Sequence, residues 1–327
     1  VKSVLEATKS FSNFENAINI SASSSSVHAA LLGPSNTSTD NITLRASGEK
    51  AGISIIGSTS RASSFGLWLA SLTIETKNGQ TTIDSGDDDL SLGRDSGRIF
   101  TFKPVTGQTG GDLSITTSDL IDSTHMSINT AGTVSFAPSS TSFDAAESFP
   151  TTSSTVSIGS LTVGSSTNTQ TLTVSSPVTS TGNITYSGGA FTQASSSATL
   201  SATSSGSTVR ILADSSIALS GAVRASNNGI VVLEPRVSGT GIRVGGTNAS
   251  TMLLTATQLQ THLSTTTLRI GDRERTGSVI INDSLNLTGK AQNLAIRSNA
   301  NVSAGSGVVV TVANLGIDAG GTISFPG

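Results

Sequence analysis

The chain has 327 residues, a formal net charge of −3 and no cysteine. The missing cysteines exclude a disulfide scaffold and a cysteine-ligated metal site, and the lack of a basic run leaves nucleic-acid phosphates without an electrostatic partner. No stretch approaches the ~18 consecutive apolar residues of a membrane-spanning helix, so we expect neither a nucleic-acid partner nor a membrane span. Serine and threonine supply 105 residues, but the apolar residues between them alternate regularly, which favours β-structure over disorder.

Residues 1–20 differ from the rest of the chain. Their apolar residues recur at spacings of three and four, which predicts a short amphipathic helix. These residues are Val4, Ala7, Phe11, Phe14 and Ile18. Two roles are open for this helix: it caps the unpaired strand edges at the end of a β-structure, or it oligomerises the chain. Residues 21–39 are rich in serine and predict a turn-rich connection.

From residue 40 onwards, short alternating triplets such as Ile42-Thr-Leu44 are separated by glycine, asparagine, aspartate or serine clusters. This pattern is typical of short strands and predicts one solenoid half over 40–136 and a second over 155–327. Residues 137–154 hold two prolines among serines and threonines, and we interpret them as a loop or as the boundary between the halves. A capping-box pattern followed by spaced leucines predicts a helical insertion at 255–264.

A repeated phrase indicates how the strands stack. The segment 293–303 returns at 314–324, so that Leu294 matches Leu315 and Ile296 matches Ile317, 21 residues later. Such a period is typical of a β-solenoid, in which each coil buries its inward side chains only against the next coil. Further residues fit the same spacing: Val209 with Ile230, Ile211 with Val232, Val232 with Leu253, and Val223 with Val244. We therefore predict an all-β parallel β-helix of ~21 residues per coil, preceded by the N-terminal amphipathic helix.

The C-terminal segments resemble repeats of filamentous-haemagglutinin-like surface proteins. The resemblance is carried by the run from Leu254 to Asp272, which contains Thr267-Leu-Arg-Ile-Gly271, and then by Gly277-Ser-Val-Ile-Ile, Leu294-Ala-Ile and Gly321-Thr-Ile-Ser. It is clear over 250–327 and weaker over 70–136. The resemblance implies a right-handed parallel β-helix that is exported by a two-partner or autotransporter route and displayed on a bacterial surface, with adhesive or biofilm roles. It transfers no functional residue to this chain.

One dense acidic cluster is a candidate Ca²⁺ site. It consists of Asp84, Asp87, Asp88 and Asp89. Calcium prefers several oxygen ligands, and aspartate-rich turns of β-solenoids bind it. The chain contains neither an EF-hand loop nor the calcium-binding nonapeptide, so a solvated polar turn is the alternative, and we expect no other cofactor.

A polysaccharide lyase or hydrolase on the same fold is the main competing hypothesis. It would use the acidic cluster or a second charged group, which consists of Arg269, Asp272, Arg273, Glu274 and Arg275. Paired carboxylates need a fixed separation across the sugar bond, which the sequence does not supply. The alternation of charge in the second group indicates a self-neutralising exposed turn instead, and we expect no enzymatic activity.

The sequence thus predicts a secreted or surface-displayed, extracellular structural and adhesive rod that could serve as the subunit of an extracellular filament. We expect it to self-associate end to end or through the N-terminal helix, since an open coil end is a template for strand pairing. Its serine-, threonine- and asparagine-rich faces favour contacts with glycans or with the surface of a host or neighbouring cell. The alternatives are the polysaccharide-active enzyme and a glycan-binding module.

Overall fold

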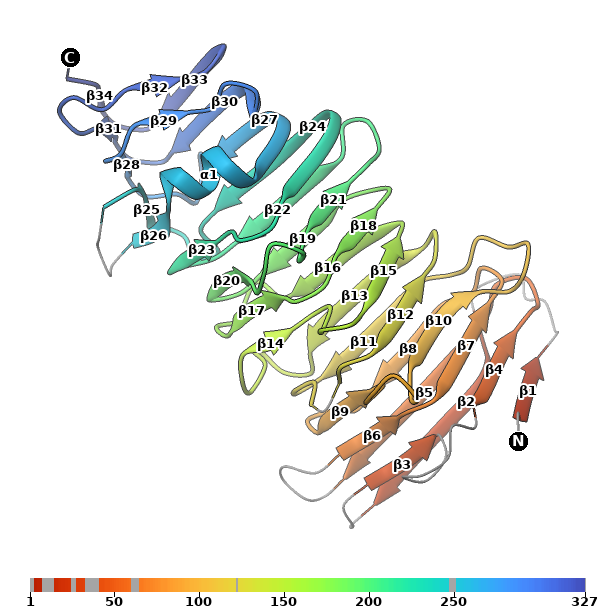
Figure 1. Cartoon of the computed structure of the whole chain (residues 1–327). Helices are drawn as coiled ribbons and strands as arrows, with labels where there is room; N and C mark the ends of the chain where they lie inside the picture. The colour runs from red at the N-terminus through yellow and green to blue at the C-terminus, as the bar shows by residue number, and fades with distance from the viewer. Residues whose placement is uncertain are drawn as a thin grey trace. The chain divides into compact units, whose positions relative to one another are not determined.

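The computed structural model describes residues 3–7, 15–24, 28–32, 41–59, 65–121, 123–246 and 251–326. In this part of the chain the secondary structure is nearly all β, with one helix among parallel strands. The chain divides into two compact units (Figure 1). Unit 1 contains Val1–Val163 and Ser175–Val178, and unit 2 contains Gly164–Val174 and Thr179–Gly327.

Unit 1 consists of parallel strands stacked in three rows, drawn from red to yellow-green in Figure 1. The first row is β1 (Ser3–Ala7), β4 (Ile42–Ala46), β7 (Leu72–Thr76), β10 (Phe100–Pro104), β12 (Met126–Asn129) and β15 (Thr155–Ile158). The second row is β2 (Glu15–Ser24), β5 (Ala51–Thr59), β8 (Thr81–Asp84), β11 (Leu113–Thr117), β13 (Thr133–Pro138) and β16 (Ser160–Gly164). The third row is β3 (His28–Leu32), β6 (Phe65–Leu69) and β9 (Asp89–Leu92). A short strand, β14 (Glu147–Ser148), follows later in the chain.

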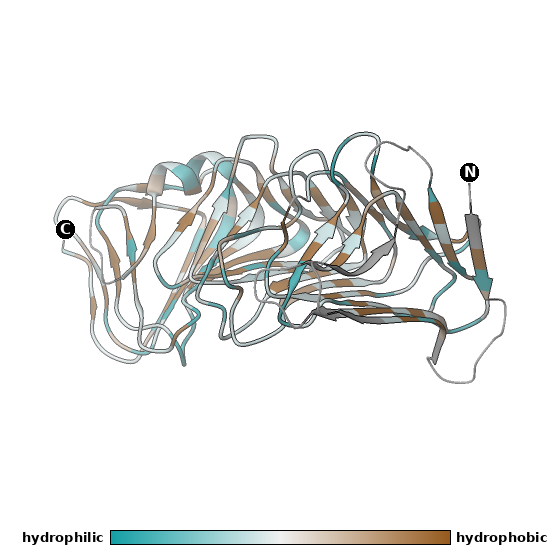
Figure 2. Cartoon of the chain, turned by 90° about the horizontal axis from the view of Figure 1, so that it is seen from below, coloured by the Kyte–Doolittle hydropathy of each residue, from teal (hydrophilic) through white to brown (hydrophobic). Residues whose placement is uncertain are grey.

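Ladders of apolar side chains form the core of unit 1. In the first row, one buried residue of each strand pairs with the equivalent residue of the next strand. This ladder is Leu44, Ile74, Phe102, Ile128 and Val156. Hydrophobic and hydrophilic residues alternate along the strands (Figure 2), because successive side chains of a strand point to opposite faces. Burial of each large apolar side chain contributes about 1.5–3 kcal/mol, so the stacking of coils supplies the stability that a single coil lacks.

Unit 2 repeats this arrangement with two main rows. The first is β19 (Ile184–Ser187), β22 (Thr208–Leu212), the second half of β24 (Val223–Glu234), β27 (Leu263–Ile270), β30 (Ala291–Ser298) and β33 (Asn314–Ala319). The second is β17 (Thr171–Val174), β20 (Ala190–Gln193), β23 (Ser216–Ala218), β26 (Thr251–Leu254), β25 (Gly241–Val244), β28 (Val279–Ile281), β31 (Val302–Ala304) and β34 (Ile323–Ser324). The first half of β24 pairs with β21 (Leu200–Ala202), and β29 (Leu285–Asn286) pairs with β32 (Val310–Thr311). The remaining strand, β18 (Val178–Ser180), spans the division between the units.

The helical insertion that the sequence predicts at 255–264 is confirmed. It forms α1 (Ala256–His262), which begins after the N-cap residue Thr255 and buries Ala256 and Leu259. The helix packs against β27 and β29 of unit 2. Among the described residues, no helix has both the length and the apolar character needed to cross a membrane.

The 21-residue period holds for some coils and fails for others. Asn293 pairs with Asn314, as predicted, but Thr171 pairs with Ala190, 19 residues later. Val231 pairs with Leu268 across a coil of 37 residues that contains α1. Turns thus absorb insertions, while backbone hydrogen bonds and inward side chains keep the strands in register.

Four residue matches based on that period are wrong. Val209 pairs with Val231 rather than with Ile230, so the true spacing in that coil is 22 residues. The same shift replaces Val232 by Leu233 as the partner of Ile211. Leu253 belongs to β26, whereas Val232 belongs to β24 in the other row. Val223 and Val244 also lie in different rows.

The prediction of an N-terminal helix over 1–20 is wrong for the described residues. Ser3–Ala7 and Glu15–Ser24 are strands that pair in parallel with β4 and β5. Ile18 pairs with Ile53 and is buried. Helix propensity is a weak preference, and here the strand ladder with the next coil overrides it. Phe11 and Phe14 lie outside the described residues.

The serine-rich connection predicted at 21–39 contains strands as well. Residues 21–24 continue β2, and His28–Leu32 form β3, which pairs with β6. Residues 25–27 and 33–40 lie outside the described residues. Serine-rich composition therefore does not exclude strands here, because the neighbouring coil supplies hydrogen bonds to the backbone.

Residues 137–154 belong to unit 1 and contribute to its core. Phe143 and Phe149 both stack on Phe136, with ring centroids 4.9 Å apart in each pair. All three rings are buried. The segment is therefore a loop-rich excursion that packs on its own unit, and the division between the units lies further along the chain, between 163 and 179.

Candidate functional site

The four aspartates of the predicted Ca²⁺ site lie around one turn, and two of them, Asp84 and Asp88, accept hydrogen bonds within it. The Asp84 carboxylate accepts the backbone N–H of Gly86 at 2.8 Å. The backbone carbonyl of Asp88 accepts the hydroxyls of Ser85 and Thr117 at 2.7 and 3.1 Å. Among the described residues, no three histidine, aspartate or glutamate side chains form a group that could hold a metal ion. The Ca²⁺ hypothesis for Asp84, Asp87, Asp88 and Asp89 therefore stays a prediction without geometric support.

The fold assembles a different acidic cluster in unit 1, around Glu147. The Glu147 side chain hydrogen bonds to the Asp119 carboxyl group and accepts the backbone N–H of Leu120 at 3.0 Å. Asp119 also accepts the backbone N–H of Ala145 at 2.9 Å. Glu147 is only 4% exposed, and this burial, reinforced by Asp119, raises its pKa to about 9. Glu147 is therefore protonated at neutral pH and can donate to Asp119.

Asp89 belongs to the same acidic surroundings. Burial raises the pKa of Asp89, and the charges of Asp119 and Asp144 raise it further. A hydrogen bond from the Ser118 hydroxyl at 3.3 Å acts in the opposite direction. Asp89, a member of the predicted Ca²⁺ cluster, thus lies near Asp119 and Asp144, which come 30 and 55 residues later in the chain.

The Asp119–Glu147 pair is a poor catalytic pair for glycoside cleavage. Enzymes with two catalytic carboxyl groups hold them about 5–9.5 Å apart, on either side of the sugar bond. Here the two groups are in hydrogen-bonding contact, and Glu147 is buried. Burial of Glu147 beside Asp119 leaves no room for a sugar between the two carboxyl groups.

The second predicted charged group does not converge on one site either. Arg269 binds Glu234 at 3.3 Å, and Arg210 binds the same carboxylate through Nε at 2.6 Å. Glu234 is fully buried, and its carboxylate forms ion pairs with one arginine of β22 and one of β27. Arg273 instead pairs with Asp318 at 3.0 Å. The Asp272 carboxylate accepts a hydrogen bond from the backbone N–H of Glu274 at 2.9 Å. The Arg275 side chain is exposed.

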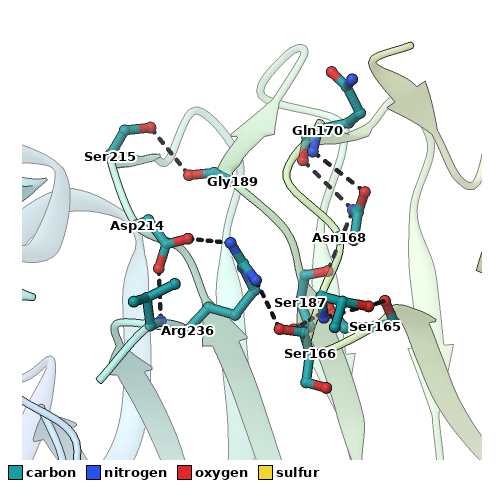
Figure 3. Close-up of polar contacts among 11 residues, drawn as sticks. Ser165, Ser166, Asn168, Gln170, Ser187, Gly189, Asp214, Ser215 and Arg236 are labelled. Atoms are coloured by element: carbon teal, nitrogen blue, oxygen red, sulfur yellow. Dashed lines mark hydrogen bonds and ion pairs between the residues drawn. The ribbon is translucent and has the colours of Figure 1, made fainter. Parts of the chain in front are cut away.

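A third polar network of unit 2 surrounds Arg236 (Figure 3). Its guanidinium donates to the Ser166 carbonyl at 2.6 Å and to the Asp214 carboxylate at 2.5 Å. The other oxygen of Asp214 accepts the backbone N–H of Val237 at 2.8 Å. The Arg236 side chain is only 8% exposed. The network therefore ties together turns from three parts of unit 2 and acts as a structural clamp.

A groove on unit 2 has the features of a binding site. Its volume is about 710 Å³, within the range of ligand pockets. Four chain segments from successive coils line it. They are Arg224–Asn227, Ser264–Thr266, Thr288–Gln292 and Thr311–Ala313.

An irregularity in β24 shapes the groove. The pairing of β24 with β27 shifts between Ala225 and Ile230, and the backbone adopts positive φ angles of 48° and 64° at Asn227 and Asn228. Asparagine tolerates this left-handed conformation better than most residues. Thr265 and Thr266 of β27 fix the bulge: the Thr265 hydroxyl donates to the Gly229 carbonyl at 2.9 Å, and the Asn228 N–H donates to the Thr266 hydroxyl at 3.1 Å.

The strand register places two cations in line across the groove. Arg224 pairs with Ser264. On the next strand Thr265 pairs with Ala291 and donates its N–H to the Lys290 carbonyl at 2.9 Å, so Lys290 lies beside Ser264. Arg224 and Lys290 are therefore two strand spacings apart, or about 10 Å between Cα atoms. The Ser264 hydroxyl group therefore lies between the positions of the two cations, Arg224 and Lys290.

The other lining side chains supply hydroxyl and amide groups. They include Ser226, Asn227, Thr266, Thr288 and Gln292. The lining contains no carboxylate and no aromatic ring, so hydrogen bonds and positive charge are the means by which it can hold a ligand. The sequence gives no sign of this groove, since Arg224 and Lys290 are 66 positions apart and isolated in the sequence; only the strand register places them in one row.

A comparison with protein-family models, curated proteins and solved structures finds no match to this chain.

Proposed function

We propose that the protein is a secreted or surface-displayed right-handed parallel β-helix with an adhesive role, and that unit 2 binds glycans through the groove. The resemblance of 250–327 to repeats of surface proteins supports the handedness and the location. The groove carries the binding function, because four coils present hydroxyl, amide and cationic groups along one open path.

The chemistry of the lining matches that of a saccharide. Sugar hydroxyls are both donors and acceptors, and so are serine and threonine hydroxyls and asparagine and glutamine amides. Each hydrogen bond contributes about 0.5–1.5 kcal/mol net, so recognition requires several of them in parallel. Polar side chains from the four coils of the lining supply enough hydrogen-bonding groups without a deep cavity.

The polysaccharide-active alternative has less support. The carboxylates of Asp84, Asp89 and Asp272 from the two sequence-predicted groups bind structural partners, and the groove itself has no carboxylate for acid–base work. We therefore propose binding without turnover. Incubation of the protein with a bound glycan, followed by an assay for new reducing ends or unsaturated sugars, tests this: product release would refute it.

A glycan array with the purified full chain tests the binding function. The variant Ser264→Trp places a large side chain in the middle of the cation row, whereas Ser238→Trp places one on an exposed turn outside the lining. We expect the wild type and Ser238→Trp to bind the same saccharides and Ser264→Trp to lose them. Circular dichroism establishes that both variants are folded. Absence of any saccharide binding, or equal binding by both variants, would refute the proposal.

A further inference from the structure

The two cations of the groove have no acidic partner. In the part of the chain that the structure describes, neither Arg224 nor Lys290 forms an ion pair. Several other arginines of unit 2 do bind carboxylates: Arg210, Arg236, Arg269 and Arg273. Two unneutralised cations in a lining without carboxylates create a positive potential along the groove.

Both cations are placed to meet a ligand. The Lys290 ammonium donates one hydrogen bond to the Thr261 carbonyl at 3.1 Å, which orients it and leaves two further donors. Arg224 is exposed, and its planar guanidinium matches a carboxylate with two parallel hydrogen bonds. The Ser264 hydroxyl lies between the two cations.

The extent of the groove indicates a ligand larger than a single small anion. Arginine and lysine side chains whose Cα atoms are about 10 Å apart are long enough to share one small anion, but such an anion would leave the hydroxyl and amide groups of the other lining segments unused. A saccharide chain with a carboxylate on successive sugars offers anions at intervals and hydroxyls in between. A single-stranded nucleic acid also repeats its charge, but the lining has no aromatic ring on which bases stack.

We propose that the groove binds an acidic oligosaccharide of the uronic-acid type, with its carboxylates on Arg224 and Lys290. This inference rests on the proposed glycan-binding function and specifies the saccharide class. Its affinity falls with rising ionic strength, because the cations are exposed and salt screens such contacts.

Calorimetric titration with oligogalacturonates tests the assignment, since the same backbone is obtainable as free acid and as neutral methyl ester. The variants Arg224→Gln and Lys290→Gln each remove one groove cation. Arg275→Gln removes an exposed cation outside the lining and is the matched control for net charge. We expect the free acid to bind at least about ten-fold more tightly than the ester, and each groove variant to weaken binding of the acid by at least about five-fold, with Arg275→Gln unchanged.

Each contrary result is informative. Equal affinity for acid and ester, or equal effects of Arg224→Gln and Arg275→Gln, would overturn the acidic-ligand assignment and leave glycan binding in place. Binding of a sulfated neutral oligosaccharide in preference to the uronate would overturn the carboxylate assignment. If the glycan array also shows no binding of any saccharide, both this inference and the proposed function fail.

Discussion

Replacement of Glu147 by glutamine removes a buried group that ionises only at a high energetic cost. The pKa of Glu147 rises from an ordinary value of 4.5 to about 9 in the folded chain. Each pKa unit corresponds to about 1.36 kcal/mol, so holding this side chain ionised in the folded chain would cost up to about 6 kcal/mol. Glutamine keeps the oxygen that accepts the Leu120 N–H and offers its amide N–H to Asp119.

The sign of the pH dependence follows from proton binding. Between pH 4.5 and about 9 the folded state holds the proton and the unfolded state has lost it, so the stability of unit 1 falls as pH rises through this window. Below pH 4.5 both states are protonated and the penalty is absent. We therefore expect Glu147→Gln to match the wild type near pH 4 and to be several kcal/mol more stable near pH 8.

Tryptophan fluorescence can follow this effect in the correct unit. Trp68 is the single tryptophan of the chain and lies in β6 of unit 1. Urea unfolding of wild type and Glu147→Gln is compared across pH 4–9, with Asp87→Asn, at an exposed carboxylate of the same unit, as the control. A wild-type stability that does not fall with pH, or a Glu147→Gln variant less stable than wild type at pH 8, would show that the proton-bearing carboxyl group has been assigned wrongly.

Three further substitutions test the contacts that hold the coils together. Arg236→Ala leaves Asp214 without its ion pair and frees the Ser166 carbonyl, and we expect a loss of about 3 kcal/mol, measured by thermal unfolding of unit 2; a change below experimental error would refute the clamp. Glu234→Gln removes the buried charge between two arginines, and we expect about 1–3 kcal/mol of destabilisation that Arg275→Ala does not reproduce. Phe136→Ala removes the ring on which Phe143 and Phe149 stack. We expect the free energy of unfolding of unit 1 to fall by about 3–5 kcal/mol, as followed by the fluorescence of Trp68. A fall no larger than that caused by a surface substitution would show that these rings contribute little to the core.

The architecture was predictable because it depends on local alternation. Triplets such as Ile53-Ser-Ile55 point two apolar side chains inward, and the repeat at 293 and 314 gives the stacking partner directly. The helix α1 begins after the predicted capping position, Thr255, but the Thr255 side chain makes no cap hydrogen bond, and only Leu259 of the spaced leucines lies in the helix. The strands at 3–7 and 15–24 were not predictable, because apolar residues spaced for a helix also suit a strand once a neighbouring coil offers hydrogen bonds.

The groove was not predictable, and the reason lies in the unequal lengths of the coils. Arg224 and Lys290 lie in one row because strand pairing continues on both sides of the β24 bulge and after α1. A strict 21-residue period misplaces these positions, just as it pairs Val209 with Ile230 instead of Val231. The acidic pair Asp119–Glu147 has the same origin, since the loop before β14 folds back onto unit 1.

The charged side chains that the structure describes fall into those with a partner on an adjacent coil and those without one. A charged side chain whose partner comes from an adjacent coil, as in Arg210 with Glu234, contributes to the register and is unavailable to a ligand. A charged side chain that the register leaves without a partner, in a lining that several coils share, is not neutralised by the fold. Arg224 and Lys290 meet that description within the groove. Irregular coil length therefore shapes the groove, because the β24 bulge and α1 belong to the coils whose segments line it.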